Sequence, residues 1–452
     1  MTRTKIISTF GPALFDEAVL KEALKYADII RFNFSHGTPE EKLEAKEKVL
    51  KLSKELNKDV ALLADLPGPK IRVSKLENDV IIKTGDTIIF SHSSNSKPGE
   101  VPIEIDIYDD MKVGCEVSIG DGNPKLVIKE LKDRKIICTA LQDGKIASRK
   151  GINVKGVNMS AAPPTQEDLK LIKFVKDNGF DYVALSFVKT AQNVKEARKL
   201  SGDLLIISKI ERQEAISDIK EIVKESDGVM IARGDMALNI EFNQVPVVQD
   251  MIIKECRESS KPVIVATQML ASMTSNQSPT RAEMTDVANA VKSGTDCVML
   301  SDETAVGRYP LDALKAMSSI ITYTEAVGLS NKEQQKNITD KNEGVAAAAA
   351  SITHMCKTER IFIPTVTGKT AKVLSSFRPE AEIYAITESE KLRRSMCMYY
   401  GIRGVNLGKF SSEEEMTSSI KKHAGESSIK SYLIVFGKSA TAGISDTIKC
   451  VW

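Results

Sequence analysis

Four charged side chains follow two short apolar runs between residues 204 and 235. Lys209 and Glu211 come just after the first run, and Arg233 and Asp235 come just after the second. Side chains two residues apart on an extended chain point to the same side, so each pair is expected to share one face. Two carboxylates and two cations at one place would suit a divalent metal ion together with a phosphorylated substrate.

The apolar runs themselves predict buried strands. Residues 204–207 and 229–232 are rich in Ile and Val and are too short for a helix. The stretch between them carries Ile216, Ile219 and Ile222 at helical spacing. A strand, a helix and a second strand form a right-handed unit in a parallel sheet, which brings both strand ends to the same edge. The charged residues are therefore expected to meet at that edge.

The same alternation of strand and helix extends over much of the chain. Residues 1–70 and 156–329 together contain eight strand patterns, each followed by a helical pattern. This periodicity favours an α/β fold of the closed (β/α)8 TIM barrel type over an open sheet. Functional groups of such a barrel are expected at the carboxyl ends of its strands.

Two further domains are predicted outside the barrel. Residues 71–155 contain short alternating runs separated by Gly, Asp and Asn turns, which is typical of a small all-β domain inserted into the barrel. Residues 330–344 are polar and predict a linker. Strand and helix patterns then return, so residues 330–452 are expected to form a C-terminal α/β domain.

Bulk composition argues against several classes of protein. The 452 residues are 42% hydrophobic and 27% charged with a net charge of +2, so charge implies no attraction to nucleic acid or to a membrane. The first residues contain no signal peptide, and no apolar run reaches the roughly 18 residues of a membrane span, so we expect a cytoplasmic protein. The seven cysteines and four histidines are scattered, which argues against zinc, iron–sulfur and disulfide frameworks.

Polar side chains follow nearly every predicted barrel strand at the same end. A single Ser or Thr at such a place is most often a helix N-cap. The charged members abut apolar strand residues, where an unpaired charge is costly, so together they favour a site. Carboxylates without His or Cys nearby suit Mg²⁺ or Mn²⁺. These side chains are Arg31, Asn33, Ser35, Asp65, Lys209, Glu211, Arg233, Asp235, Thr267, Gln268, Ser301 and Glu303.

Nine motifs resemble those of the pyruvate kinase family, in order and over essentially the whole chain. The resemblance implies a barrel whose inserted β-barrel domain closes as a lid, and a C-terminal regulatory domain. It implies transfer of the phosphoryl group of phosphoenolpyruvate to ADP, giving pyruvate and ATP, by a homotetramer. The motifs are T-K-I-I-S-T-F-G-P (4–12), R-F-N-F-S-H-G (31–37), D-L-P-G-P-K-I-R (65–72), K-G-V-N (155–158), I-S-K-I-E (207–211), M-I-A-R-G-D (230–235), P-V-I-V-A-T-Q-M-L (262–270), P-T-R-A-E-M-T-D-V-A-N-A-V (279–291) and M-L-S-D-E-T-A (299–305).

The resemblance assigns roles to the predicted site residues. It implies that Lys209 stabilises the transferring phosphoryl group and the enolate. It implies that Glu211 and Asp235 hold the divalent ion, Mg²⁺ or Mn²⁺. The Gly234 and Asp235 amides would bind the substrate carboxylate together with the Thr267 hydroxyl. Thr267 would also lie on the route by which the enolate is protonated.

Four more basic residues receive expectations. The resemblance implies that Arg31 contacts the phosphate from the opposite side of the site. It implies that Arg72 and Lys155, at the two ends of the inserted domain, contact the nucleotide phosphates. Arg233 is expected to form a structural ion pair that orients a neighbour.

A monovalent-cation site is the point where this chain departs from the family pattern. Many members of the family bind K⁺, and the corresponding positions here are Asn33, Ser35, Asp65 and Leu66. Where the K⁺-requiring pattern has a carboxylate, this chain has Lys70. A lysine ammonium can itself supply positive charge near the phosphates, so we expect activity that does not require K⁺.

A second candidate phosphate site lies in the C-terminal region. Thr365, Thr367, Gly368, Lys369 and Thr370 stand between a strand pattern and a helix pattern. The upstream glycine of a P-loop is missing, so a Walker site is rejected. Hydroxyls and helix amides could still hold the phosphate of an allosteric effector, which the family often binds at such a loop. An ordinary Thr-capped helix is an equally good interpretation.

Two other functions remain open. A metal-dependent lyase or aldolase acting on phosphoenolpyruvate or pyruvate could use a similar barrel, but it would not need Arg72 and Lys155. A sensor of sugar phosphates without enzymatic activity would be expected to have lost Lys209 or the carboxylates. The sequence identifies neither the effector nor the role of Asp302, which stands where the family usually has glycine.

Overall fold

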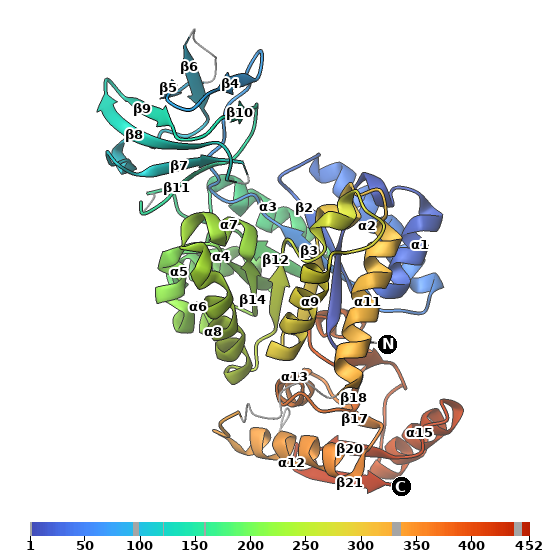
Figure 1. Cartoon of the computed structure of the whole chain (residues 1–452). Helices are drawn as coiled ribbons and strands as arrows, with labels where there is room; N and C mark the ends of the chain where they lie inside the picture. The colour runs from blue at the N-terminus through green and yellow to red at the C-terminus, as the bar shows by residue number, and fades with distance from the viewer. Residues whose placement is uncertain (1, 94–98, 121, 158–159, 328–335, 438–444) are drawn as a thin grey trace.

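Eight parallel strands close into the barrel that the sequence predicts (Figure 1). β1 pairs with both β2 and β16, which closes the circle. The (β/α)8 TIM barrel prediction is therefore confirmed. The strands are β1 (Lys5–Thr9), β2 (Ile29–Asn33), β3 (Ala61–Asp65), β12 (Tyr182–Leu185), β13 (Leu205–Ile210), β14 (Gly228–Ala232), β15 (Val263–Ala266) and β16 (Cys297–Leu300).

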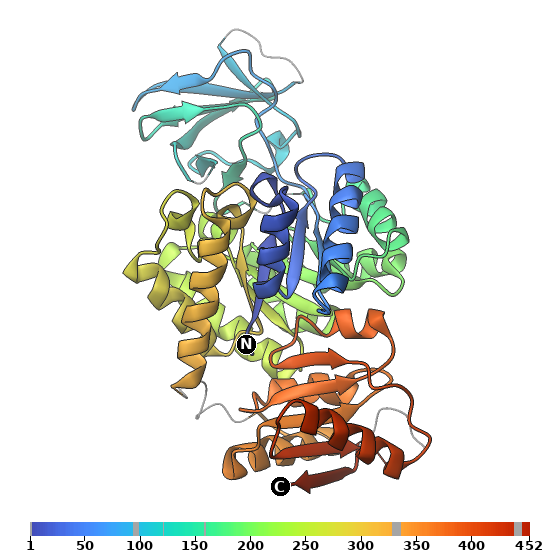
Figure 2. The same ribbon diagram turned by 90° about the vertical axis from the view of Figure 1, so that its right-hand side faces the viewer.

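The computed structural model describes the chain apart from residues 1, 94–98, 121, 158–159, 328–335 and 438–444. The barrel lies between the inserted β-domain at one end and the C-terminal domain at the other (Figures 1 and 2). None of the helices within the described part of the chain is long and apolar enough to cross a membrane.

Helices surround the barrel, and several begin at capping boxes. Thr38 with Glu41 caps α2, and Thr280 with Glu283 caps α9, so orphan backbone amides at both starts are satisfied. The barrel helices are α1 (Glu17–Tyr26), α2 (Pro39–Glu55), α3 (Gln166–Asp177), α4 (Ala191–Ser201), α5 (Gln213–Ser217), α6 (Ile219–Glu225), α7 (Arg233–Asn239), α8 (Val245–Glu258), α9 (Arg281–Ser293), α10 (Asp302–Ala305) and α11 (Pro310–Ala326).

The helical stretch between β13 and β14 differs from the prediction of one amphipathic helix. It is divided into α5 and α6 at Asp218. The Asp218 carboxylate accepts a hydrogen bond from the Ala191 amide at the start of α4, at 2.8 Å. The break therefore coincides with a tertiary hydrogen bond that links this stretch to the start of α4.

The inserted domain has its own buried core of Ile, Val and Leu side chains. Its strands form a six-stranded sheet in the order β11-β7-β8-β9-β5-β6 and a two-stranded sheet of β10 and β4. The Arg72 backbone pairs with Gly151, so the chain enters and leaves this domain at adjacent points. The strands are β4 (Val80–Ile82), β5 (Thr87–His92), β6 (Glu100–Ile103), β7 (Glu116–Ile119), β8 (Lys125–Lys132), β9 (Lys135–Ala140), β10 (Gly144–Ile146) and β11 (Ile152–Val154).

The C-terminal domain is a five-stranded α/β sheet in the order β19-β18-β17-β20-β21, in which β21 is antiparallel. Residues 341–344 of the predicted linker belong to α12, while residues 330–335 lie outside the described part of the chain. The elements are α12 (Lys341–Cys356), β17 (Arg360–Pro364), α13 (Lys369–Ser376), β18 (Glu382–Ile386), α14 (Glu390–Ser395), β19 (Ile402–Val405), α15 (Glu413–Glu426), β20 (Tyr432–Phe436) and β21 (Thr447–Val451).

Aspartates stand at the amino ends of the barrel strands, where the C-terminal domain docks. Asp181 directly precedes β12 and accepts a hydrogen bond from the Leu62 amide of the adjacent strand at 2.9 Å. Asp296 precedes β16 and accepts from the Val263 amide of β15 at 3.1 Å. Asp28 and Asp227 repeat this arrangement toward β1 and β13. These carboxylates therefore fix the start of neighbouring strands.

Candidate active site at the carboxyl ends of the barrel strands

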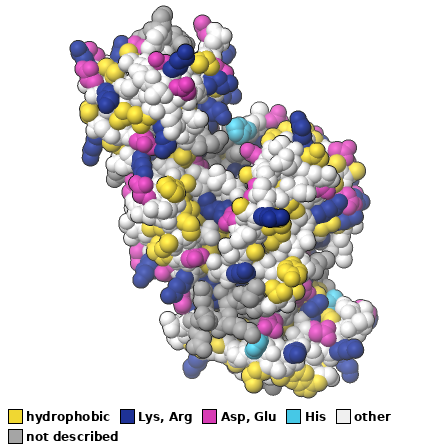
Figure 3. Space-filling model, in the orientation of Figure 1, with side chains coloured by type: hydrophobic (Ala, Val, Ile, Leu, Met, Phe, Trp, Pro, Cys, Tyr) yellow, Lys and Arg dark blue, Asp and Glu magenta, His cyan; other side chains and the backbone are white. Residues whose placement is uncertain are grey.

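Strand alternation places charged side chains inside the mouth of the barrel. Ile207 of β13 belongs to the core within the barrel, and Lys209 two residues later shares its face. The same alternation puts Arg31 of β2 and Asp65 of β3 on the inner face. Asp65 and Lys209 are the last inward residues of β3 and β13, and Arg31 precedes Asn33, the last inward residue of β2. Figure 3 shows a recess between the barrel and the inserted domain.

Asp65 links two cations across the floor of the site. Its Oδ2 accepts a hydrogen bond from Arg31 Nε at 2.7 Å, and its Oδ1 accepts one from Lys209 Nζ at 3.1 Å. Burial would raise the pKa of the Asp65 carboxyl, but the Lys209 and Arg31 charges lower it below its ordinary value. Asp65 is therefore ionised, and it holds the two cations in fixed positions.

Lys209 lies between two carboxylates. Its Nζ is 3.1 Å from Glu211 Oε1 as well as 3.1 Å from Asp65 Oδ1. Burial alone would lower the pKa of Lys209, but the Asp65 and Glu211 carboxylates raise it above its ordinary value. The spacing argument that put Lys209 and Glu211 on one face is thus confirmed, and Lys209 remains charged at any ordinary pH.

Glu211 is fully buried and only partly satisfied. Its Oε2 accepts a hydrogen bond from the Phe187 amide at 2.6 Å. Its Oε1 lies near the Lys209 ammonium but accepts no well-aligned hydrogen bond from the described residues. Burial raises the pKa of the Glu211 carboxyl; the Lys209 ammonium opposes this and the Asp235 carboxylate adds to it. An underused buried oxygen beside a second carboxylate suits a cation ligand.

Asp235 faces the inserted domain through Lys70. The Lys70 Nζ donates to Asp235 Oδ1 at 2.5 Å and lies 5.8 Å from the centre of the Phe187 ring. Glu211 and Asp235 offer the hard oxygen donors that Mg²⁺ and Mn²⁺ prefer. No group of three or more His, Cys, Asp or Glu side chains within the described ranges could hold a metal. The two carboxylates fit an ion that takes its remaining ligands from substrate and water.

The expectation that Arg233 and Asp235 share one face is wrong. α7 begins at Arg233, so the extended geometry behind that expectation ends at Ala232. Arg233 turns away from the site and forms an ion pair with Asp286 at 2.8 Å. Its Nη2 also donates to the Thr267 carbonyl at 2.8 Å. Arg233 is therefore a structural residue that orients the end of β15, as the sequence analysis expects.

Thr267 closes another side of the site. Its hydroxyl accepts a hydrogen bond from the Gly234 amide at 2.8 Å and donates to the Ala266 carbonyl at 2.6 Å. Thr267, Gln268 and Phe187 all have left-handed backbone conformations, with φ of 69°, 55° and 59°. Such conformations are costly for residues other than glycine and gather at functional sites. The strain therefore marks the same rim as the charged residues.

The proposed monovalent-cation positions have partners within the chain. Asn33 Oδ1 accepts from the Ser35 amide at 3.0 Å, and both Asp65 oxygens are bound as described above. The Leu66 carbonyl accepts from the Ser186 hydroxyl at 2.7 Å. Lys70 reaches Asp235 rather than any of these groups. Positive charge is thus already present beside the Asp235 carboxylate.

The two ends of the inserted domain differ in their surroundings. Arg72 donates through Nη1 to the Arg149 carbonyl at 3.1 Å, at the point where its backbone pairs with Gly151. Lys155 lies at the far end of β11 and forms an ion pair with Glu241 at 2.6 Å. The structure thus places Arg72 at the hinge and Lys155 against the barrel rim.

One basic residue at the hinge was missed. Lys150-Gly151-Ile152-Asn153 is a second copy of the motif K-G-[IV]-N, five residues before the copy that contains Lys155. The Lys150 carbonyl accepts from the Val73 amide at 2.9 Å, so this copy lies beside the Arg72 strand. The internal repeat in the sequence was the signal that could have drawn attention to Lys150.

Two small polar residues were also missed. Ser186 accepts a hydrogen bond from Lys209 Nζ at 2.8 Å, and Thr9 accepts one from Arg31 Nη1 at 3.0 Å. Each lies two residues after an inward-facing apolar residue, as Lys209 does. Glu303, by contrast, is bound by the backbone, because its carboxylate accepts hydrogen bonds from the Ser301 amide at 2.7 Å and from the Leu270 amide at 3.2 Å. The buried Ser301 hydroxyl has no hydrogen-bond partner among the described residues.

The loop at 365–370 lies far from this site, in the C-terminal domain (Figure 1). The Thr365 hydroxyl accepts from the Gly368 amide at 2.8 Å, and the Thr367 hydroxyl is 3.4 Å from the Lys369 amide. Thr370 is buried and shares a hydrogen bond with Ser445. These contacts describe a Thr-stabilised helix start whose Thr367 and Lys369 side chains remain exposed.

Comparison with known proteins agrees with this architecture. The family profile "Pyruvate kinase, barrel domain" matches residues 1–314, and "Pyruvate kinase, alpha/beta domain" matches residues 343–451. A pyruvate kinase of Clostridium perfringens is 38% identical over 443 residues, covering 94% of this chain and 93% of that protein. A pyruvate kinase of Thermococcus litoralis is 35% identical over 436 residues, covering 93% and 92%.

A third relative extends the match to nearly the full length of both proteins. The pyruvate kinase of Clostridium acetobutylicum is 35% identical over 472 aligned positions, covering 99% of this chain and 98% of that protein. The two family profiles and the nearly full-length matches agree with the site at the barrel mouth. The chain therefore belongs to the pyruvate kinase family.

Proposed function

We propose that this enzyme transfers the phosphoryl group of phosphoenolpyruvate to ADP, giving pyruvate and ATP, as the last step of glycolysis in the cytoplasm. The observation that carries the proposal is the position of Lys209. Its ammonium lies between the Asp65 and Glu211 carboxylates at the barrel mouth. Asp65 also forms an ion pair with Arg31. Two cations held in place by one buried carboxylate suit a phosphoryl group whose charge is redistributed during transfer.

Each residue then has a physical task. Lys209 stabilises the phosphoryl oxygens and the enolate oxygen, and Arg31 neutralises the phosphoryl group from the β2 side. A divalent ion held by Glu211 and Asp235 would neutralise substrate carboxylate and phosphate charge. The Gly234 amide and the Thr267 hydroxyl, now bonded to each other, would turn to the substrate carboxylate. Thr267 also lies where a proton could be delivered to the enolate carbon.

The direct test is formation of pyruvate from phosphoenolpyruvate, with and without ADP, in the presence of Mg²⁺ or Mn²⁺. We expect activity that requires both ADP and the metal, and that falls by about 10² to 10³-fold in Lys209→Met. Activity without ADP would favour the lyase or aldolase alternative. A metal-loaded, folded enzyme that forms no pyruvate would refute the proposal.

The absence of a K⁺ requirement is proposed from Lys70. Its ammonium already lies 2.5 Å from Asp235, so a positive charge occupies this region without an added ion. Assays in a Tris buffer with and without KCl should give similar rates. Lys70→Glu should lower the rate without KCl and recover part of it when KCl is added. Strong activation of the unaltered enzyme by K⁺ would contradict the proposal.

For the nucleotide phosphates we propose contacts from Arg72 and from one lysine of the repeated motif. Lys155 is the residue that family resemblance suggested, but it is paired with Glu241, whereas Lys150 lies beside the Arg72 strand. Lys150→Ala and Lys155→Ala should be compared for their Michaelis constants for ADP. An increase in Lys155→Ala alone would keep the original assignment, and an increase in Lys150→Ala alone would move it.

The loop of Thr365, Thr367, Gly368, Lys369 and Thr370 is proposed to bind the phosphate of an allosteric effector. The exposed Thr367 and Lys369 side chains at the start of α13 support this. Activation should be measured with sugar phosphates and AMP, on the parent enzyme and on a variant with Thr367→Ala and Thr370→Ala. Activation that persists in the variant would remove this site from consideration.

A homotetramer is proposed as the assembly. Supporting it, Phe242, Val247 and Met251 are 79%, 72% and 40% exposed, and the last two share one face of α8. Light scattering coupled to size-exclusion chromatography measures the mass directly. A Val247→Asp, Met251→Asp variant should form smaller species, and a monomeric parent enzyme would contradict the proposal.

A further inference from the structure

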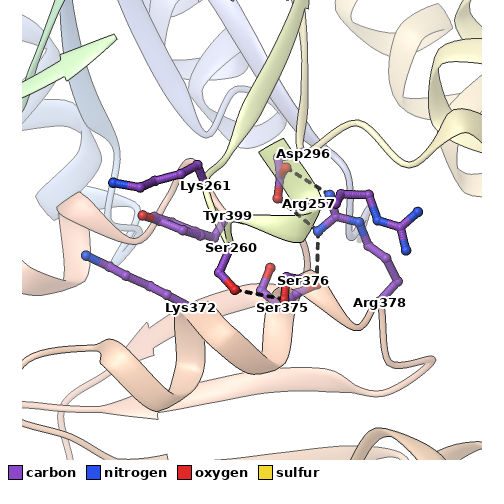
Figure 4. Close-up of a pocket in the computed structure, with 9 residues that line it drawn as sticks. All are labelled: Arg257, Ser260, Lys261, Asp296, Lys372, Ser375, Ser376, Arg378 and Tyr399. Atoms are coloured by element: carbon purple, nitrogen blue, oxygen red, sulfur yellow. Dashed lines mark hydrogen bonds and ion pairs between the residues drawn. The ribbon is translucent and has the colours of Figure 1, made fainter. Parts of the chain in front are cut away.

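A notch opens where the foot of the barrel meets the C-terminal domain, and its lining is strongly basic (Figure 4). It is a shallow depression, and its side chains leave no enclosed room for a water molecule. Four of its side chains are cationic and one is a carboxylate. The lining residues are Arg257, Ser260, Lys261, Asp296, Lys372, Ser375, Ser376, Arg378 and Tyr399.

The single carboxylate of the notch is engaged by Arg378 and by two backbone amides. Asp296 binds Arg378 through both oxygens, at 3.0 and 2.8 Å. It also accepts hydrogen bonds from the Val263 and Tyr400 amides at 3.1 and 3.0 Å. Its capacity as an acceptor is therefore used by the junction of the two domains, which leaves the positive charge of Lys261 and Lys372 in excess among the described lining residues.

Lys261 and Lys372 carry that excess on the open side of the notch. In Figure 4 their side chains extend in the same direction, one from the barrel and one from α13, with the Tyr399 ring between them. The Lys372 Nζ is 5.3 Å from the centre of that ring. Lys261 Nζ donates to the Ser226 carbonyl at 2.6 Å, whereas Lys372 forms no ion pair within 4 Å among the described residues and feels the Asp227 carboxylate only at longer range. Two ammonium groups thus face one small space.

The nearest acid is also engaged elsewhere. The negative charge of Asp227 favours the charged form of both lysines and so raises their pKa values, against the effect of burial. Its Oδ2, however, is 2.6 Å from Arg198 Nη1 and accepts from the Ile206 amide at 2.8 Å. Burial still lowers the pKa of Lys261 and of Lys372 below the ordinary value. A half-buried ammonium without a carboxylate partner is costly unless an anion from solution accompanies it.

We propose that this notch binds a phosphate group, carried by a small phosphate monoester or present as free phosphate. The Lys261 and Lys372 ammonium groups supply the charge, and the Tyr399 hydroxyl between them supplies a hydrogen-bond donor. Ser260 and Ser376 hydroxyls, which already share a hydrogen bond at 3.2 Å, line the inner wall. The site is separate from the catalytic residues and does not depend on the proposed reaction.

A phosphate bound in the notch would change the contact between the barrel and the C-terminal domain. The notch is narrow, so a bound phosphate requires Lys372 to rotate or α13 to shift relative to the barrel. α13 begins at Gly368-Lys369 and ends at Ser376, so one short helix connects the loop at 365–370 with the notch. A ligand at either place therefore bears on the same element, although the two sites use different residues.

Site-specific lysine labelling tests the proposal. Reductive methylation of the intact enzyme, followed by mass spectrometry of its peptides, measures the modification rate of every lysine. Inorganic phosphate should slow modification of Lys261 and Lys372 several-fold while leaving the exposed Lys422 of α15 unchanged. Glycerol phosphate distinguishes a monoester site, if it protects at lower concentration, from a site for free phosphate. Unchanged rates at both lysines with either probe would overturn the proposal.

Variants provide a second measurement. The rise in melting temperature caused by phosphate should be smaller in Lys372→Gln than in the parent, and should be kept in Lys372→Arg and in the control Lys422→Gln. Phosphate bound in the catalytic site contributes equally to all four proteins, and repeating the comparison in the Thr367→Ala, Thr370→Ala background removes the contribution of the loop at 365–370. An undiminished rise in Lys372→Gln would overturn the proposal. If Lys372→Gln fails to fold, the labelling of the parent enzyme decides the question.

Discussion

The two ends of the barrel use the same residue types for different purposes. At the amino ends of the strands, Asp181 and Asp296 each bind a strand amide and an arginine of the C-terminal domain, Arg394 and Arg378. At the carboxyl ends, Lys209 is shared between two carboxylates, and one oxygen of Glu211 lacks a hydrogen bond from the described residues. The two aspartates at the foot are each paired with an arginine and a strand amide, whereas the Glu211 carboxylate at the mouth is only partly satisfied.

This difference separates stability from chemistry within one fold. Satisfied buried charges fix the start of each strand and attach the C-terminal domain, and their removal should weaken folding. Partly satisfied charges have capacity left for a ligand, so their removal should weaken catalysis. Substitutions at the two ends should therefore give opposite patterns of effect.

The largest effect on rate is expected at the mouth. Lys209→Met removes the cation that Asp65 and Glu211 hold in place, and kcat should fall by about 10² to 10³-fold. Circular dichroism should show a folded protein, because Asp65 keeps its ion pair with Arg31. A kcat within tenfold of that of the parent enzyme would show that catalysis does not depend on the Lys209 charge.

The largest effect on stability is expected at the foot. Arg378→Met leaves the buried Asp296 carboxylate without its cation, which should cost about 3–5 kcal/mol. Urea denaturation followed by fluorescence should show a lower midpoint, while kcat for the folded enzyme changes little. A loss of kcat without a change in the midpoint would reverse the assignment of the two ends.

A smaller effect is expected at the hinge above the mouth. A Cβ atom on Gly151 would lie 2.8 Å from Lys70 Cε, so Gly151→Ala should displace Lys70 from Asp235. Activity should fall by about tenfold, in line with the cost of small misplacements in active sites. The control is Gly425→Ala on α15, where an added Cβ meets no atom within 4 Å. Equal activity of the two variants would show that the position of Lys70 is unimportant.

The smallest effect is expected from His36, which lies near the mouth. Burial lowers its pKa below the ordinary value, and Arg72 and Lys42 add to this. The folded state therefore binds the proton less well than the unfolded state, so stability is retained above about pH 6.5 and is lost as pH falls below it. His36→Gln should reduce this loss when unfolding is measured at pH 5.5 and 7.5. An identical pH dependence in both proteins would exclude His36 as its source.

Local rules predicted the parts of the site that lie on single strands. Lys209 and Glu211 share a face because β13 continues in extended form to Ile210. The same rule failed for Arg233 and Asp235, because a helix starts at Arg233 and turns their side chains apart. An alternating pattern indicates where a strand runs, but the residue at which it becomes a helix depends on packing around it.

Such local rules could not predict contacts between distant parts of the chain. Lys70 and Asp235 are 165 residues apart, and no local pattern connects them. The fold class was predictable because eight repeats of one pattern leave few arrangements, and the family motifs fixed the order of the domains. The aspartates at the foot are visible in the sequence, but only the closed barrel shows that each binds the amide of the adjacent strand.

The pairing of Arg72 with Gly151 also bears on how the chain folds. β3 and β12 are neighbours in the barrel, although the whole inserted domain lies between them in sequence. Closing a long flexible loop carries an entropic cost that grows with its length. An inserted domain that folds first brings its own ends together and shortens that loop to residues 66–72 and 151–181. Early folding of this domain would thus speed assembly of a barrel with which it shares no core.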